Sequence, residues 1–498
     1  MRQRPLRLRL ADALGVTRSV APGHEAVALG GGQDWLVLGL GPDPAGLAAA
    51  LPAEARVAYL ECPAFVAGAG EAWRAAVPAS WRRVEALGPV LPGNILMHRQ
   101  ALQLFPDFWA PVRAGLLLPS PAGPAGPEGS DASGKGTVLL AKTPGSMLLP
   151  AIARGFGEEG FAVAEVDRQS LLEHLERERP ALFLSVNFAG LDRFGEVQAL
   201  CARAGVPVAA WLADNPFHVL SGVRTPAWRD VHLFVTDDWF VEPLRGHGAR
   251  RVHHLPLAAD PAFFGAAPGR PELAGRLLFV GRSAFPDKEA FFSGLSPDAG
   301  LWPEATAMLA RGERPDYGWW ARSLGIDVFW PGLAARRVGR GAEESGLAWR
   351  ELVIREAART GALTVCGDAA WKNLDGAAFD YLPPVPYGPV LAGMYASARY
   401  VVGAVSPLLP HGLTQRHFDV WAAGGCLLTD AAPGLALFPE ELTRPATYAR
   451  ARDIPRLARE RASDRDGLAA AWRELVAAQH TYRHRARRIL ERVGAGGA

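Results

Sequence analysis

The stretch His411–Asp430, HGLTQRHFDVWAAGGCLLTD, combines a loop, a short helix and a buried strand. Thr414 is a residue type that caps helices, so we expect the helix to begin directly after it. The glycine pair Gly424 and Gly425 can end that helix. The apolar run Cys426–Thr429 is typical of a strand in a parallel sheet, which is covered on both faces. The stretch therefore predicts an α/β fold in this part of the chain.

The start of this helix is a candidate anion site. A helix that follows a loop presents free backbone N–H groups, and Arg416 in the first turn adds a cationic fork. Asp419 lies five residues beyond Thr414, roughly 7 to 8 Å along the helix axis, which is about the reach from a diphosphate to a ribose. The pattern predicts a phosphate-and-ribose site. The same spacing also fits an amphipathic helix in which Arg416 and Asp419 are solvated.

The stretch resembles the donor-binding signature of the CgeB-like, spore-maturation-type glycosyltransferases. These enzymes have the GT-B architecture of two facing Rossmann-like domains, and their signature is G-L-T-Q-R-x-F-E-x-x-A-x-G-G followed by an apolar strand ending in T-D. The chain matches it at Gly412, Leu413, Thr414, Gln415, Arg416, Phe418, Ala422, Gly424, Gly425, Thr429 and Asp430. The resemblance implies that Gly412, Thr414, Gln415 and Arg416 hold a nucleotide-sugar donor.

Two positions depart from the pattern. Asp419 stands where the family usually has Glu, so its carboxylate is one methylene shorter, and the resemblance implies that it holds the ribose hydroxyls. In the wider retaining group two glutamates lie eight positions apart, and the first falls on His411. An imidazole does not copy a carboxylate. His411 therefore remains a catalytic candidate by position, without the role of that glutamate.

A second patch, Arg276–Lys288 with the sequence RLLFVGRSAFPDK, is an apolar strand that ends at Gly281 and Arg282. It resembles the start of the C-terminal domain in the same enzymes, where a V-G-R strand end and a nearby lysine hold the donor diphosphate. The resemblance implies this role for Arg282 and Lys288. Fixed cations there favour the transition state, because the leaving nucleoside diphosphate gains negative charge. A solvated strand end is the alternative. Gly367 ends a later strand, where the donor base can stack.

Strands and helices alternate after residue 137, which predicts a parallel sheet with helices on both faces. Ligands of such sheets bind beyond the carboxyl ends of the strands. Asp214 follows the strand Val206–Trp211, and its surroundings resemble a W-x-x-D-N-P segment of the CgeB-like N-terminal domain. Asp214 is therefore a candidate base for the acceptor hydroxyl. An Asx turn at Asn215 before Pro216 is the alternative.

Residues 1–118 predict a separate Rossmann-like unit. An apolar strand, Trp35–Leu40, leads into a G-x-G turn at Gly39 and Gly41, and Glu61 ends the next strand. An acid at this distance is where a Rossmann-like domain holds a ribose or an adenosyl group. The turn resembles that of S-adenosylmethionine methyltransferases, although the residues after Gly41 depart from their pattern. We favour an accessory domain without chemistry of its own.

The remaining segments divide the chain. Residues 119–136 are almost wholly Pro, Gly, Ser and Ala, so we expect a flexible linker. Gly129–Lys135 has P-loop spacing, but Gly136 replaces the required Ser or Thr and a strand follows, so we exclude a P-loop. We expect an acceptor domain at 137–262, a donor domain at 270–455 with a helical insertion at about 284–362, and a C-terminal helix within 456–498. That helix, at 466–493, resembles the closing helix that packs across the cleft in the family.

Bulk properties exclude several classes of protein. A net charge of +2 gives no reason to expect nucleic acid or an anionic membrane as a partner. The four cysteines have neither C-x-x-C nor zinc spacing, so they do not predict a zinc site. We expect the protein to reside in a reducing cytoplasm. No apolar stretch reaches 18 residues, and the arginine-rich N-terminus lacks the apolar core of a signal peptide. Neither a membrane span nor secretion is expected.

These observations predict a cytoplasmic GT-B glycosyltransferase of the α/β class. It would pass a sugar from a nucleotide diphosphate sugar to a hydroxyl of a glycan, protein or small molecule. We expect neither a cofactor nor a metal, because arginine, lysine and a helix start can stabilise the leaving diphosphate. Two alternatives remain open. One is an S-adenosylmethionine-dependent methyltransferase that uses the turn at Gly39 to Glu61, and the other is a non-catalytic protein that binds sugar nucleotides.

Overall fold

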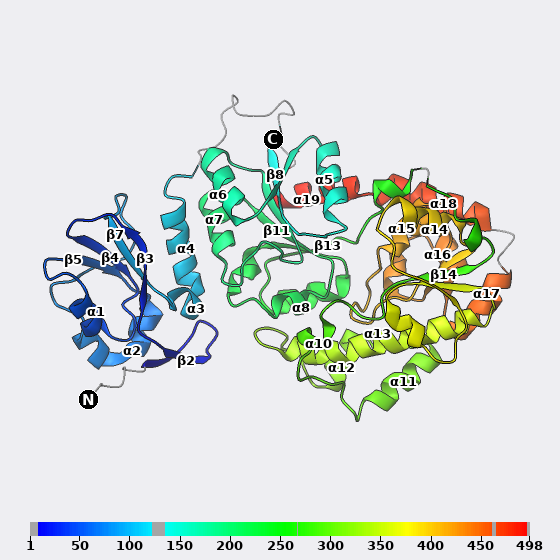
Figure 1. Ribbon diagram of the computed structural model, residues 1–498, viewed down its shortest axis with the longest axis horizontal. Coiled ribbons are helices and arrows are strands. Elements are labelled where there is room, and N and C mark those ends of the chain that lie inside the picture. The colour runs from blue at the N-terminus through cyan, green and yellow to red at the C-terminus, as the bar shows by residue number, and fades with distance from the viewer. Residues whose placement is uncertain (1–7, 122–134, 266, 461–464, 496–498) are drawn as a thin grey trace.

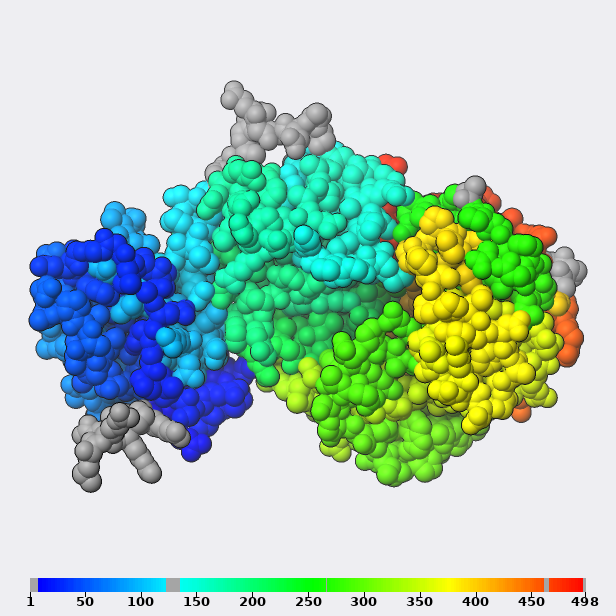
Figure 2. All heavy atoms as spheres, in the orientation of Figure 1, coloured from blue at the N-terminus to red at the C-terminus, as the bar shows by residue number. Residues whose placement is uncertain are grey.

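The computed structural model describes residues 8–121, 135–265, 267–460 and 465–495. Three units with central sheets follow one another along the chain (Figure 1). Most of the linker predicted at 119–136 lies outside the described residues. In the space-filling view the N-terminal unit lies against one end of the rest of the molecule (Figure 2).

The N-terminal domain is a mixed sheet with helices. Its strands are Leu8–Ala11 (β1), Thr17–Val20 (β2), His24–Leu29 (β3), Asp34–Leu38 (β4), Arg56–Leu60 (β5), Arg82–Arg83 (β6) and Asn94–His98 (β7), and its helices are Pro44–Ala50 (α1), Pro63–Ala75 (α2), Ala101–Leu104 (α3) and Pro106–Leu117 (α4). The main sheet has the order β3-β7-β4-β5-β6 and is parallel except for β3. The separate hairpin β1–β2 reaches toward the second unit (Figure 1).

The second unit, which we call the acceptor domain, has six parallel strands. They are Thr137–Ala141 (β8), Ala162–Val166 (β9), Leu182–Val186 (β10), Val208–Leu212 (β11), His232–Val235 (β12) and Arg251–His254 (β13), in the order β13-β12-β11-β10-β8-β9. The helices are Leu149–Glu158 (α5), Arg168–Arg177 (α6), Glu196–Arg203 (α7), Pro216–Leu220 (α8) and Val241–Gly246 (α9). Every residue of β8, β10 and β11 is buried, because helices cover both faces of the sheet.

The third unit, the donor domain, repeats this plan. Its parallel strands are Leu277–Val280 (β14), Leu363–Cys366 (β15), Asp380–Leu382 (β16), Tyr400–Val402 (β17), Leu427–Asp430 (β18) and Thr447–Tyr448 (β19), in the order β16-β15-β14-β17-β18-β19. Its helices include Pro389–Ser397 (α14), Arg416–Ala422 (α15) and Glu440–Ala446 (α16). Two such domains facing each other confirm the predicted fold class.

The insertion between β14 and β15 connects the two domains. It contains the helices Lys288–Phe291 (α10), Trp302–Arg311 (α11), Tyr317–Ser323 (α12) and Ala334–Ala358 (α13). Trp320 and Val338 pack into the core of the acceptor domain, whereas Trp349 and Val353 near the other end of α13 pack into the core of the donor domain. No role for this insertion follows from its sequence. In the structure it spans the two domains along one side of the molecule (Figure 1).

The C-terminal segment connects the domains a second time. The single helix expected at 466–493 is two helices, Arg465–Gln479 (α18) and Tyr482–Val493 (α19), preceded by Ile454–Glu460 (α17). The chain leaves the helix at His480, whose carbonyl accepts a hydrogen bond from the N–H of Ala259. Ala259 lies in the segment 255–261 after β13, which leads from the acceptor domain into the donor domain and which we call the hinge. The guanidinium of Arg485 donates to the carbonyls of Pro256 and Leu257. As a result α18 packs on α15 of the donor domain and α19 on α5 of the acceptor domain.

Candidate active site

A cavity of about 380 Å³ lies at the carboxyl ends of β14 and β15, beside the start of α15. Met147 of the acceptor domain contributes to its wall. Six of the residues predicted to bind the donor line it together: Arg282, Gly367, Thr414, Gln415, Arg416 and Asp419. Gly412 and Lys288, which the sequence also assigned to the donor, are not in this lining.

Two strand ends meet closely at the floor of the cavity. A β-carbon on Gly367 would lie 2.2 Å from the carbonyl oxygen of Gly281 and 2.8 Å from the ring of Trp371. The indole N–H of Trp371 donates to the same carbonyl at 2.8 Å. A larger residue at position 367 would therefore push the two strand ends apart. The predicted place for the donor base is a side-chain-free part of the cavity wall.

Arg416 is the central cation of the cavity. Within the described residues its guanidinium makes neither an ion pair nor a hydrogen bond, and its Nη1 is fully buried. Burial lowers the pKa of Arg416; the Tyr395 hydroxyl opposes this effect and the charge of Arg350 adds to it. Burying an uncompensated charge is unfavourable. The site is therefore prepared for an anion that the protein itself does not supply.

Arg282 is the second cation. It follows β14 directly, is exposed, and lines the same cavity as Arg416. No carboxylate in the described part of the chain pairs with it. The predicted placement of Arg282 and Arg416 at one site thus agrees with the structure, although their ligand is not observed.

The start of α15 differs from the prediction. The helix begins at Arg416, and neither Thr414 nor the preceding Gln415 caps it with a side chain. The N–H of Thr414 donates to Nδ1 of His417, and the N–H of His417 donates back to the Thr414 carbonyl. The N–H groups of Phe418 and Asp419 are bonded to the Gln415 carbonyl. These N–H groups are not free for an anion, and a seven-residue helix has a small dipole. The N–H groups of Gln415 and Arg416 have no hydrogen-bond partner among the described residues, so the expected helix-start anion site stays a prediction that rests on these two groups.

Asp419 is buried and fully engaged by the protein. One carboxylate oxygen accepts the N–H of Asp260 at 3.1 Å and the Gln415 amide at 3.0 Å, and the other accepts the Tyr387 hydroxyl at 2.6 Å. Burial raises the pKa of Asp419 to about 7, against the effect of these hydrogen bonds. The shorter carboxylate is held between α15 and the hinge. Asp419 thus lines the cavity with both oxygens already hydrogen-bonded within the protein, and its role on the ribose hydroxyls stays a prediction.

Gln415 and Gly412 hold the same region in place. The Gln415 amide donates to the carbonyl of Ala258 at 2.6 Å, and its oxygen accepts the Tyr482 hydroxyl at 3.1 Å. The N–H of Gly412 donates to Asp237 of the acceptor domain at 2.9 Å. Both residues thus fix the donor helix and its loop against the acceptor domain and α19, and Gln415 alone also lines the cavity.

Lys288 lies away from the donor cavity. It begins α10, is buried, and its ammonium forms an ion pair with Glu344 of α13 at 2.7 Å. A buried lysine is found almost only with such a partner. The placement of Lys288 on the diphosphate, inferred from the resemblance, is therefore corrected to a contact inside the insertion.

Asp214 lies at the end of β11, between the strand and α8. Its carboxylate accepts the side-chain amide of Asn187 at 2.8 Å, whereas Asn215 forms the cap of α8. The Asx alternative is thus correct for Asn215 and leaves the carboxylate of Asp214 outside the cap. The surrounding protein raises the pKa of Asp214, although the residue still reaches solvent. A raised pKa suits a group that accepts a proton.

His411 faces the acceptor domain. Its ring Nδ1 lies 2.9 Å from Asp238, and its backbone N–H donates to Asp237. Asp237, Asp238 and His411 have the spacing of a metal-binding group. However, the oxygens of Asp237 already accept the N–H groups of His411, Gly412 and Trp239. The group therefore works as a cross-link between the domains and fits a metal poorly.

The G-x-G turn of the N-terminal domain is closed. A β-carbon on Gly41 would lie 2.9 Å from the ring of His98, which fills the space beyond the turn. Glu61 is 3% exposed and accepts the N–H groups of Leu40 and Cys62 at 2.7 and 2.9 Å. The carboxylate predicted to hold a ribose or adenosyl group is thus hydrogen-bonded to the backbone beside it. This argues against the methyltransferase alternative.

The sequence reasoning missed several lining residues. Pro384, Val385 and Tyr387, in the loop after β16, form one wall of the cavity, and Tyr395 of α14 contributes to it. An aromatic residue in a loop after a parallel strand was the available signal. Met147 had no such signal, because its position depends on how the two domains face each other.

One comparison with known protein families covers part of the donor domain. A family described as Glycosyl transferase-like matches residues 349–491, which include α15, β18, α18 and most of α19. The prediction of a glycosyltransferase is thereby confirmed, while the CgeB-like subgroup stays a prediction. No curated protein matches the sequence. Among the described residues, no helix combines the length and the apolar character needed to cross a membrane.

Solved structures with a similar course of the chain include three from trehalose metabolism. They are an E. coli structure described as trehalose-6-phosphate bound with UDP-2-fluoro glucose (11% identity, TM-score 0.39, 93% of this chain and 99% of that one), a Burkholderia xenovorans UDP-forming trehalose-phosphate synthase (12%, 0.35, 93% and 99%) and the N-terminal domain of Candida albicans trehalose-6-phosphate phosphatase (10%, 0.37, 96% and 100%). At these scores the likeness adds nothing about substrate.

Proposed function

We propose that the protein binds a nucleotide diphosphate sugar with the diphosphate between Arg282 and Arg416. The carrying observation is that these two guanidiniums, without counter-ions in the described residues, line one cavity at the strand ends. Two positive charges balance most of the charge of a diphosphate, and arginine forks match phosphate oxygens. The base would lie against Gly367 and the loop that carries Tyr387.

In the proposed reaction the bond between the anomeric carbon and the diphosphate oxygen breaks. The electron pair goes to the diphosphate, whose charge Arg282 and Arg416 stabilise. The acceptor oxygen bonds to the anomeric carbon and gives its proton to Asp214. This charge balance needs no metal. The four cysteines are buried free thiols, which supports our proposal of a reducing cytoplasm, and the signature residues support a CgeB-like enzyme.

The test measures release of nucleoside diphosphate from a panel of nucleotide sugars by the full chain. We expect turnover with at least one donor, and its loss in Arg282→Gln/Arg416→Gln. The matched control is Arg154→Gln/Arg459→Gln, which removes two exposed arginines outside the cavity lining. Asp214→Asn separates the remaining alternative: an enzyme loses turnover but keeps donor binding. A non-catalytic binding protein would bind donors and release nothing even as the parent protein.

A further inference from the structure

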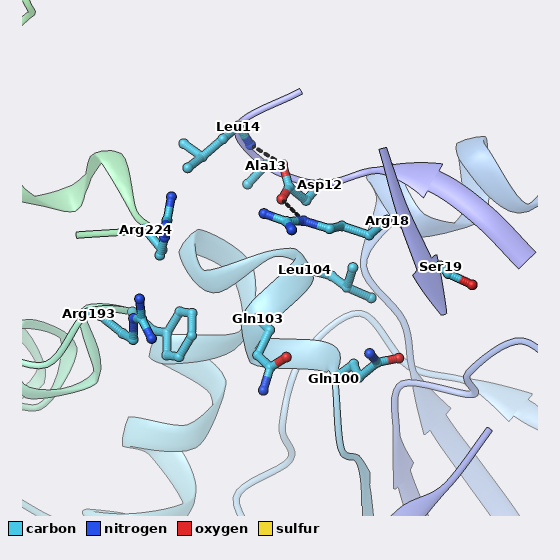
Figure 3. A pocket seen from close by; sticks show the side chains of 11 residues that line it. Asp12, Ala13, Leu14, Arg18, Ser19, Gln100, Gln103, Leu104, Arg193 and Arg224 are labelled. Atoms are coloured by element: carbon cyan, nitrogen blue, oxygen red, sulfur yellow. Dashed lines mark hydrogen bonds and ion pairs between the residues drawn. The ribbon is translucent and has the colours of Figure 1, made fainter. Parts of the chain in front are cut away.

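A second cavity, of about 430 Å³, lies between the N-terminal domain and the acceptor domain. The β1–β2 hairpin and α3 form one wall, and the segments before α7 and after α8 form the other (Figure 3). Its volume is within the range of small-molecule sites. The donor cavity shares none of its lining residues.

Three arginines from the two domains line this cavity. Arg18 belongs to the N-terminal wall, and Arg193 and Arg224 belong to the acceptor-domain wall (Figure 3). The N–H of Arg224 donates to the carbonyl of Arg193 at 2.7 Å, which holds these two residues side by side. No carboxylate in the described ranges pairs with either of them.

Asp12 is the one acidic residue in the lining, and its carboxylate is already hydrogen-bonded within the N-terminal domain. Its two oxygens accept the N–H groups of Leu14 and Val16 and the guanidinium of Arg18. Its side chain is 5% exposed, compared with 47% for Arg18. The lining charges therefore sum to plus two, and the guanidiniums rather than the carboxylate face the space.

Another cation adds to this field. Burial lowers the pKa of Arg336 on α13, and the nearby charge of Arg224 lowers it further. Arg336 has no carboxylate partner among the described residues. Like charges held together are unfavourable until an anion binds between them. A guanidinium pair matches the oxygens of a phosphate group in both charge and geometry.

The remaining lining combines the polar residues Gln100, Gln103 and Ser19 with the apolar residues Ala13, Leu14, Leu104 and Phe194. Gln100 uses its side-chain oxygen to accept the N–H of Ala21 at 2.8 Å. Its NH₂ group and the Gln103 amide have no hydrogen-bond partner in the described parts of the chain, and both residues line the cavity. A ligand with a phosphate at one end and hydroxyl groups at the other fits this division.

We propose that this cavity binds a small phosphate monoester, with the phosphate at Arg193 and Arg224 and the hydroxyl-bearing part at Gln100 and Gln103. The bound ligand ties the N-terminal domain to the acceptor domain. This role is separate from donor binding and gives the accessory domain a ligand of its own.

The test titrates the full chain with inorganic phosphate, ribose 5-phosphate and adenosine 5′-monophosphate by calorimetry. Arg282→Gln/Arg416→Gln serves as the background, because it removes the cations of the donor cavity. Adding Arg193→Gln/Arg224→Gln should raise the dissociation constants at least tenfold. Adding Arg154→Gln/Arg459→Gln should leave them unchanged. Arg193→Lys/Arg224→Lys keeps both charges and should retain binding, which separates loss of charge from loss of fold.

The three probes identify the source of the phosphate. Tightest binding of ribose 5-phosphate indicates a sugar phosphate, and tightest binding of the monophosphate indicates a nucleotide. Equal binding of all three probes overturns the placement of a hydroxyl-bearing part at Gln100 and Gln103. The proposal is overturned if the background protein binds none of the probes. It is also overturned if the Arg193→Gln/Arg224→Gln protein binds all three as the background protein does.

Discussion

The turn after β4 and the strand end after β14 both have a glycine directly after an apolar strand, which is typical of a ligand site. In the structure the first is filled by protein groups, whereas the second borders a cavity. Beyond β4, His98 covers Gly41, and Glu61 is bonded to the backbone of its own turn. Beyond β14, a cavity remains open, and Arg282 and Arg416 face it without a partner in the described residues. The difference teaches that a glycine turn with an acid indicates a binding site only when its polar groups are not satisfied by the protein.

The largest effect is expected from filling the floor of the open site. Gly367→Ala places a β-carbon 2.2 Å from the Gly281 carbonyl oxygen. The two strand ends must separate, so we expect a loss on the order of 3 kcal/mol in the free energy of unfolding of the donor domain. Chemical unfolding of the full chain, followed by tryptophan fluorescence, measures it. Gly157→Ala, where no atom lies within 4 Å of the added carbon, is the control. Equal stability of both variants would show that the floor can relax.

The next effect concerns Glu61, the buried acid beside the turn after β4. Burial raises the pKa of Glu61 to about 7 from its ordinary 4.5, so the folded protein keeps a proton that the unfolded chain loses between these values. The free energy of unfolding must therefore fall as pH rises from about 4.5 to 7, by up to about 3 kcal/mol. Asp419, whose pKa is also raised to about 7, acts in the same direction.

Glu61→Gln measures the share of the N-terminal domain. We expect this variant to lose part of the pH dependence between 4.5 and 7, even if its stability at pH 5 falls because one acceptor is lost. Thermal unfolding at several pH values gives the slope. A variant with the slope of the parent would mean that Glu61 is ionised in the folded protein and reachable by solvent.

Removing the cation of the open site should affect binding rather than folding. Arg416→Gln should weaken binding of a nucleoside diphosphate by roughly 1.5 to 3 kcal/mol, the range for a hydrogen bond to a charged group. Binding of the nucleoside should change little, and the melting temperature should not fall, because an uncompensated buried charge is removed. Calorimetric titration of both ligands measures this, with Arg154→Gln as control. A parallel loss for the nucleoside would place Arg416 at the base and not at the phosphates.

The sequence predicted the parallel sheets and the positions of Arg282, Gly367 and Arg416 well, because apolar runs and strand ends are local signals. It could not predict what Lys288 and Asp419 contact. Lys288 pairs with Glu344, which lies 56 positions later, and Asp419 bonds to Tyr387 and to the hinge. Such partners depend on how the domains and the insertion pack, and a motif does not record them.

The smallest expected effect tests the buried acid directly. Because both oxygens of Asp419 are held by Asp260, Gln415 and Tyr387, a 2′-deoxy donor should lose the same affinity in Asp419→Asn as in the parent. The two changes should add to within about 0.5 kcal/mol, as they do for groups that do not touch. Titration of the ribose and 2′-deoxy donors into both proteins completes the cycle. A coupling well above this value would mean that Asp419 contacts the ribose when the donor binds. Its hydrogen bonds to Asp260, Gln415 and Tyr387 would then belong only to the protein without donor.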